Sequence, residues 1–202
     1  MENQIEKNIL DIFLYKNKLK FNEIEKNIKI RSNKLAYHIK SLLNKNILQK
    51  ENEEYILSET AEYLIPYLSN KQSLLPVILI HIGDKNEAFL YTRTKRPFLG
   101  KLSLPGGRIL IGENLDKATK RIMKEKFNLE VKIDYVKSVS FEHVKRKNKI
   151  IHSFILITVK AQTKQKVKLT SLANNRNKII TSDYQLIKQD TRIPIKNITT
   201  KT

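Results

Sequence analysis

Two carboxylates, Glu113 and Glu125, are the first candidates in this sequence for binding a metal ion. The chain has no cysteine, so a bound metal would need Asp, Glu or His as ligands. Because hard divalent cations take oxygen ligands, Glu113 and Glu125 are candidate ligands for one Mg²⁺ or Mn²⁺ ion. Arg121 lies four residues before Glu125, a spacing that allows an ion pair along a helix and would orient the carboxylate.

A lysine occupies the same predicted helix face. Positions 122, 125 and 126 project to one side of a helix, where the sequence places a hydrocarbon, a carboxylate and an ammonium. The ammonium of Lys126 brings a positive charge to the face that would bind a cation, so Lys126 is a candidate to meet a ligand phosphate directly. Glu142 or Glu87 could complete a remodelled site.

The elements around these residues predict an alternation of strands and a helix. An apolar run at 77–82, a turn at 83–86 and a second strand at 88–92 come first. A helix then begins after Asn114, a good N-cap, with Leu115, Ala118, Ile122 and Phe127 on its packing face.

This order and its motif are similar to the Nudix hydrolase family, whose box reads G-x5-E-x7-R-E-U-x-E-E-x-G-U, with U a bulky aliphatic residue. After the lead-in Leu104-Pro105-Gly106-Gly107, the box positions fall on Gly107, Glu113, Arg121, Met123, Glu125 and Leu129. The resemblance covers roughly residues 74–190. It implies an α/β/α sandwich with a mixed sheet and catalytic roles for Glu113, Arg121 and Glu125. Together with the two candidates above, Lys126 and Glu142, the glycines Gly106 and Gly107 form the candidate ligand site.

Three box positions depart from that pattern. Ile122 replaces the glutamate after the arginine, Lys126 replaces the second glutamate of the final pair, and Asn128 replaces the glycine. The family uses these carboxylates to hold magnesium or manganese, which clamps a diphosphate and activates water. We therefore expect inactive or weak catalysis, and Arg121 and Glu125 could instead merely brace the loop and helix.

The first 70 residues predict a different domain. Apolar residues at helical spacing indicate three helices, with Asn22 and Ser32 as N-caps, followed by strands at 47–50 and 55–57 and a fourth helix from Ser58. Residues 33–43 resemble the recognition helix of ArsR-like winged-helix regulators. With Leu35, Ile39 and Leu42 inward, the DNA-facing residues would be Asn33, Lys34, Tyr37, His38, Lys40 and Ser41. The acidic residues after Lys50 leave open a protein–protein module instead.

The charge is distributed unevenly between the two predicted domains. Of the formal +19 over 202 residues, residues 1–70 carry +1 and residues 71–202 carry +18. Such a field attracts nucleic acid or phosphorylated ligands, although codon bias toward lysine would produce a similar surplus. A candidate phosphate-binding surface is the predicted turn with Lys145, Arg146, Lys147 and Lys149. His143 and His152 would face each other there, whereas His81 is expected in the core.

These observations favour an α+β chain with a winged helix-turn-helix domain at 1–70 and a Nudix-like domain at 71–202. No apolar run approaches the roughly 18 residues of a membrane span, and we expect a cytoplasmic protein. The leading hypothesis is a transcriptional regulator that binds duplex DNA through the winged helix and senses a nucleotide-derived ligand. A homodimer is one oligomeric state that the sequence allows. The alternatives are an active Mg-dependent hydrolase of nucleoside diphosphate derivatives and an RNA-binding module.

Overall fold

The chain consists of two compact units, described one at a time. The computed structural model describes residues 4–62 and 73–198, and the units are Met1–Ser73 and Leu74–Thr202. The predicted boundary between residues 70 and 71 lies outside the described residues. None of the helices in the described ranges is long and apolar enough to cross a membrane.

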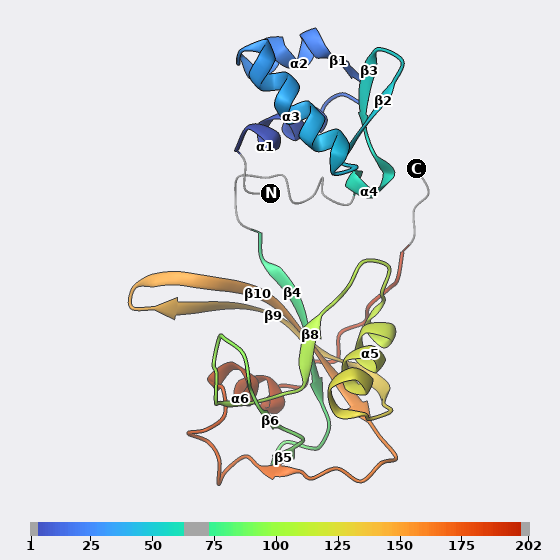
Figure 1. Cartoon of the computed structure of the whole chain (residues 1–202). Coiled ribbons are helices and arrows are strands. Elements are labelled where there is room, and N and C mark those ends of the chain that lie inside the picture. Colours follow the sequence, from blue (N-terminus) through green and yellow to red (C-terminus); the bar gives the residue numbers. More distant parts are fainter. Residues whose placement is uncertain (1–3, 63–72, 199–202) are drawn as a thin grey trace. The chain divides into compact units, whose positions relative to one another are not determined.

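The described part of the first unit contains four helices, a short strand and a β-hairpin (Figure 1). Its elements are α1 (Gln4–Ile12), β1 (Leu19–Lys20), α2 (Phe21–Ile28), α3 (Ser32–Asn44), β2 (Leu48–Glu51), β3 (Glu54–Leu57) and α4 (Glu59–Glu62). The helices and the hairpin agree with the sequence prediction. Strand β1 was not predicted; it pairs with β3 and gives a three-stranded sheet of order β1-β3-β2.

The apolar residues predicted to point inward form the core of this unit. Leu35 and Leu42 are fully buried and Ile39 is nearly so, as helical periodicity requires. The predicted caps are wrong, because Asn22 lies inside α2 and Ser32 is the first residue of α3. The start of α2 is instead satisfied by Glu23, which accepts a hydrogen bond from the backbone N–H of Lys20 at 2.8 Å.

A four-stranded mixed sheet of order β8-β4-β10-β9 forms the centre of the second unit. Its strands are β4 (Leu75–His81), β8 (Gly106–Arg108), β9 (Lys132–Arg146) and β10 (Lys149–Gln162). Strands β4 and β10 are parallel, and the other two pairs are antiparallel.

Helices cover both faces of this sheet, α5 (Leu115–Phe127) one face and α6 (Thr181–Lys188) the other (Figure 1). Alternation along β4 explains the layers: Ile78 and Ile80 belong to the core with Ile122 of α5, whereas Leu79 packs in the core with Leu186 of α6. The result is a sheet between two helical layers, which agrees with the predicted sandwich.

Short strands surround the central sheet. They are β5 (Glu87–Ala88), β6 (Tyr91–Thr92), β7 (Leu102–Ser103) and β11 (Thr170–Ser171), paired β5 with β11 and β6 with β7. The strand predicted at 88–92 is therefore two separate strands.

Asn114 caps α5 as predicted, accepting a hydrogen bond from the N–H of Lys117 at 2.9 Å. Ser182 does not cap α6, because the N-cap position is Ile180.

A lysine is buried between the sheet and the end of α6. Lys137 is 2% exposed; its Nζ lies 2.9 Å from Nδ1 of His81 and donates to the carbonyl oxygen of Ile187 at 2.8 Å. Nε2 of His81 lies 3.1 Å from the carbonyl oxygen of Asp84, so Nε2 carries the proton and Nδ1 accepts. His81 is thus a satisfied core residue, as predicted, and burial lowers its pKa to about 3.

The buried amine of Lys137 predicts a rise in stability at alkaline pH. Burial lowers the pKa of Lys137 to about 8, so between pH 8 and pH 10.5 the unfolded chain holds a proton that the folded chain has released. The free energy of unfolding of the parent should therefore rise across this window by up to about 3 kcal/mol relative to Lys137→Met. Urea unfolding at several pH values measures the difference, and Lys132→Met, at an exposed position of the same strand, is the control.

Candidate functional site

The glycine pair of the motif lies where the backbone approaches both the sheet and α5. Gly106 pairs with Leu79 and Gly107 with Ile78 across β8 and β4. A Cβ atom on Gly106 would lie 2.6 Å from the carbonyl oxygen of Ile78, and one on Gly107 would lie 3.1 Å from Cδ1 of Ile122. Only glycine fits at position 106, whereas a side chain at position 107 would require Ile122 to move by a few tenths of an ångström. The Gly106 carbonyl is within hydrogen-bond distance of Lys126 near the end of α5.

Glu113 is bound by Arg121 on both carboxylate oxygens. Arg121 donates from Nε to Oε1 and from Nη2 to Oε2 at 2.9 Å, and the N–H of Leu110 donates to Oε2 at 2.9 Å. The bonds from Arg121 and then Leu110 lower the pKa of Glu113 to about 2. Arg121 also donates to the carbonyl oxygen of Arg108 at 3.0 Å. Glu113 and Arg121 therefore tie the loop after β8 to α5, whereas the bracing alternative concerns Arg121 and Glu125.

Glu125 is the more accessible of the two predicted carboxylates. Its side chain is 60% exposed, and Oε2 lies 3.4 Å from Nη1 of Arg121 in the expected i,i+4 pair. Ile122, by contrast, is 1% exposed and packs beneath Gly107. The predicted face at 122, 125 and 126 therefore separates into a buried hydrocarbon, an arginine-bound carboxylate and an ammonium.

Lys126 donates from Nζ to the carbonyl oxygen of Gly106. Its pKa is lowered, first by partial burial and then by the positive charges of Arg93, Lys95 and Arg121. The charges of three other cationic side chains thus act on the Lys126 ammonium. Arg93 was missed by the sequence reasoning, because it lies on the loop after β6, outside the motif.

The donor set at this site does not fit a divalent cation. A hard cation requires several free oxygen ligands, whereas Arg121 holds Glu113 and contacts Glu125, and Lys126 covers the Gly106 carbonyl. Across residues 4–62 and 73–198, no three side chains of Asp, Glu, His or Cys gather as a metal site would require.

The other residues considered for a metal lie elsewhere. Glu87 lies on β5, which pairs with β11, and Glu142 lines a pocket beside α6. The predicted facing of His143 and His152 is wrong, because a shift in register places Ser153 opposite His143. Ser153 Oγ and His143 Nδ1 lie 2.8 Å apart.

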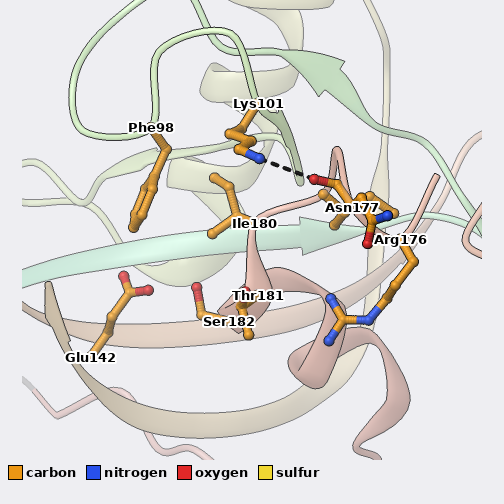
Figure 2. Close-up of a pocket in the computed structure, with 9 residues that line it drawn as sticks. Phe98, Lys101, Glu142, Arg176, Asn177, Ile180, Thr181 and Ser182 are labelled. Atoms are coloured by element: carbon orange, nitrogen blue, oxygen red, sulfur yellow. Dashed lines mark hydrogen bonds between the residues drawn. The ribbon is translucent and has the colours of Figure 1, made fainter.

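A pocket of about 540 Å³ lies between the loop after β6 and the start of α6. Its lining includes Phe98, Lys101, Glu142, Arg176, Asn177, Ile180 and Ser182. Figure 2 shows the Glu142 carboxylate and the Ser182 side chain directed into the same space below the Phe98 ring. Within the described part of the chain, the buried hydroxyl of Ser182 has no hydrogen-bond partner. Such an orphaned group at a pocket wall suits a polar ligand.

A smaller cavity of about 80 Å³ shares Phe98, Glu142, Ile180 and Ser182 with this pocket, and we call it the inner end of the pocket. Asp183 lines this inner end. It is 4% exposed, and Oδ2 accepts from Ser103 Oγ at 2.8 Å and from the N–H of Leu104 at 2.7 Å. Burial raises the pKa of Asp183 to about 6, and the positive charge of Arg93 acts against this rise. Arg93 lines the same inner end, so its charge reaches both Asp183 and Lys126.

The DNA-facing residues predicted on α3 separate into two groups. Asn33, Lys34 and Lys40 are exposed, and Tyr37 is 71% exposed. His38 is 4% exposed, so its predicted outward direction is wrong.

Ser41 is also turned inward rather than toward solvent. Its Oγ donates at 2.8 Å to Oε1 of Glu6, which is 4% exposed on α1 and lies 3.9 Å from Nδ1 of His38. Lys45 donates to the other oxygen of Glu6 at 2.7 Å. The burial of Glu6 was not predicted. Its carboxylate contacts the polar side of α3 from α1.

Structural comparison relates the second unit to known proteins. The chain is similar to a Nudix hydrolase from Nitrosomonas europaea, with a TM-score of 0.53, 13% identity, and coverage of 63% of this chain and 98% of that one. It also matches a Nudix family hydrolase from Clostridium perfringens (TM-score 0.44, 18% identity, 58% and 95% covered). A third match is the Nudix domain of Shewanella oneidensis NrtR complexed with ADP ribose (TM-score 0.43, 22% identity, 66% and 96% covered).

The first of these similarities shows the fold. The mixed sheet between α5 and α6 is a Nudix fold, as the motif spacing predicted. No family model and no curated protein matches the sequence. The winged-helix assignment of the first unit stays a prediction.

Proposed function

We propose that this protein is a DNA-binding transcriptional regulator whose Nudix-fold unit binds a nucleotide-derived ligand without a divalent metal. The observation that carries the proposal is the contact of Lys126 with the Gly106 carbonyl. A positive charge held there repels a cation and attracts a phosphate, so it substitutes for a metal in binding but not in activating water.

The surroundings of Lys126 support an anionic ligand. The positive charges of Arg93 and Lys95 act on Lys126, and Glu113 is neutralised by Arg121. Arg93 also lines the inner end of the pocket, where Phe98 offers a ring face and Ser182 a free hydroxyl. A pocket of about 540 Å³ is of a size that holds a nucleotide. We assign the phosphates to Arg93 and Lys126 and the nucleoside to the pocket.

Ligand binding should be independent of metal. Nucleotide sugars, dinucleotides and nucleoside triphosphates are screened by thermal unfolding, in EDTA and in excess Mg²⁺. A ligand at 100 times its Kd stabilises the folded state by about 2.7 kcal/mol, and we expect the same stabilisation in both buffers. The same mixtures are assayed for Mg²⁺- and Mn²⁺-dependent hydrolysis. Robust turnover that Glu125→Gln abolishes would refute the sensor proposal and establish the hydrolase.

The exposed face of α3 supports the DNA-binding part of the proposal. Lys34 and Lys40 are exposed cations, Asn33 can donate to base edges, and Tyr37 projects into solvent. The hairpin of β2 and β3, which follows α3, supports a winged-helix arrangement. If the ligand binds the DNA-competent and DNA-free states with different affinity, ligand and DNA affinities change by the same factor.

Substitutions on α3 should separate base contacts from phosphate contacts. Tyr37→Ala should reduce the discrimination between a selected operator and random duplex by about 1–3 kcal/mol, as expected for a lost base contact. The double variant Lys34→Ala and Lys40→Ala should weaken all duplexes and reduce the salt slope by about 2.

Fluorescence anisotropy over a salt series measures both effects. Lys16→Ala is a matched control, because Lys16 is an exposed lysine of the same unit outside α3. If no sequence is enriched from a random duplex library, α3 is a protein-contact helix and this part of the proposal fails.

A further inference from the structure

Strands β9 and β10 continue past the rest of the sheet as a two-stranded arm. Strand β4 pairs with β10 only from Phe154 to Lys160, whereas β9 and β10 pair with each other as far as Arg146 and Lys149. Among residues 4–62 and 73–198, no third strand therefore pairs with the arm, defined here as residues 143–153. Figure 1 shows this hairpin extending away from the helices of its unit.

Four cations gather at the tip of this arm. Lys145, Arg146, Lys147 and Lys149 are all exposed, and residues 143–153 contain no acid. Within the described ranges none of the four forms an ion pair, whereas exposed lysines elsewhere often do, such as Lys120 with Asp116 at 2.7 Å. The tip is therefore a concentrated positive charge without local compensation.

The register distributes these cations over both faces of the ribbon. Arg146 and Lys149 are directly paired and share one face, whereas Lys145 pairs with Ile150 on the other. The turn has only two residues, and Lys147 takes the left-handed conformation there with φ of 52°. A short turn holds the cations of both strands close to one end.

We propose that the arm binds duplex DNA by inserting its tip into the major groove. That groove is about 12 Å wide and admits a two-stranded β-ribbon, and phosphate backbones border it on both sides. Cations on both faces of the ribbon meet both backbones, whereas a one-faced patch would meet only one. The arm belongs to the second unit, so this DNA contact is additional to the one proposed for α3. The proposal for the arm does not depend on the proposal for α3.

The test compares two sets of four substitutions with equal change in net charge. The arm variant replaces Lys145, Arg146, Lys147 and Lys149 by Gln. The control variant replaces Lys164, Lys166, Lys168 and Lys178, four exposed lysines of the same unit, by Gln. Affinity for a random-sequence DNA duplex is measured in the full-length protein by fluorescence anisotropy over a salt series.

We expect the arm variant to bind about tenfold or more weakly at about 0.1 M salt, with a salt slope smaller by about 2–4. The control variant should change the affinity less than about twofold. A third variant, with Lys145, Lys147 and Lys149 replaced by Arg, keeps the charge and should bind like the parent. Equal effects of the arm and control variants would overturn the proposal, and so would a failure of the arginine variant to bind.

Two further measurements distinguish duplex DNA from an RNA duplex and from a protein partner. The major groove of an RNA duplex is too narrow and deep for the ribbon, so RNA of the same sequence should bind more weakly and be insensitive to the arm substitutions. Equal binding of both duplexes would refute groove insertion. If sedimentation shows that the arm variant changes the oligomeric state and its DNA affinity is unchanged, the arm is a protein interface. The Lys34→Ala and Lys40→Ala variant in the same assay tests α3 separately.

Discussion

Replacing Lys126 by glutamate should reverse the ion preference of the site. The substitution removes the ammonium from the Gly106 carbonyl and places a second carboxylate beside Glu125. Oxygen atoms from both side chains and from the backbone then offer ligands to Mg²⁺ or Mn²⁺. We expect metal at 100 times its Kd to stabilise the variant by about 2.7 kcal/mol and to leave the parent nearly unchanged.

The same substitution should weaken nucleotide binding in the absence of metal. A charge-assisted hydrogen bond to phosphate is lost and a like charge is introduced, so we expect the Kd in EDTA to rise about 100-fold or more. Calorimetric titration with the nucleotide identified by the screen measures the change.

Lys124→Glu is the matched control for this variant. Lys124 is exposed on the same helix and its replacement changes the net charge equally, so it should affect neither metal nor nucleotide binding. If the parent itself gains as much stability from Mg²⁺ as Lys126→Glu does, the parent site holds a metal and the cationic interpretation is wrong.

Local spacing predicted those parts of the site that lie on one short segment. The cap at Asn114, the helix after it and the Arg121–Glu125 pair depend on contacts within four residues, and all three were predicted. The glycine pair was predicted as well, because its position follows from the motif. What spacing did not show is that Arg121 would bind Glu113 with two nitrogen atoms.

Contacts between distant segments were not predictable from one sequence. Ser41 and Glu6 are 35 residues apart, and Lys137 and His81 are 56 residues apart. The helical pattern of α3 placed His38 and Ser41 on the polar side, where exposure to solvent was the simplest expectation. The two residues are instead turned toward the buried carboxylate of Glu6 on α1. Polar side chains can be buried when they form hydrogen bonds or ion pairs with a partner.

The contacts of Asp183 were likewise not predictable from the sequence. Replacing Asp183 should strongly lower the free energy of unfolding. In the sequence it is one acid at the start of a short helix. In the fold it joins α6 to Ser103 and Leu104, which are 80 and 79 residues away. Pro105 alone separates Leu104 from the glycine pair. Asp183→Ala leaves the buried hydroxyl and N–H without their acceptor, so we expect a loss of about 2–4 kcal/mol in the free energy of unfolding. Urea unfolding measures it.

An isosteric replacement separates the hydrogen bonds of Asp183 from its charge. Burial raises the pKa of this carboxyl from its ordinary 3.8 to about 6, so between these values the folded chain holds a proton that the unfolded chain has released. Stability linked to Asp183 is therefore complete below pH 3.8 and is lost as the pH rises through 6. Relative to Asp183→Asn, the parent should lose about 3 kcal/mol across this window.

The pH series also distinguishes a ligand-site role from a purely structural one. Asp183→Asn keeps an acceptor for the Leu104 N–H, so nucleotide binding at neutral pH should persist, whereas Asp183→Ala should weaken it by loosening the segment before Gly106. Asp134→Asn removes an exposed carboxylate and controls for the loss of one negative charge. If parent and Asp183→Asn show parallel stability profiles from pH 4 to pH 7, the carboxyl of Asp183 has the same pKa in the folded and the unfolded chain. The raised pKa would then be wrong, and the inner end of the pocket would be more open to water than its burial indicates.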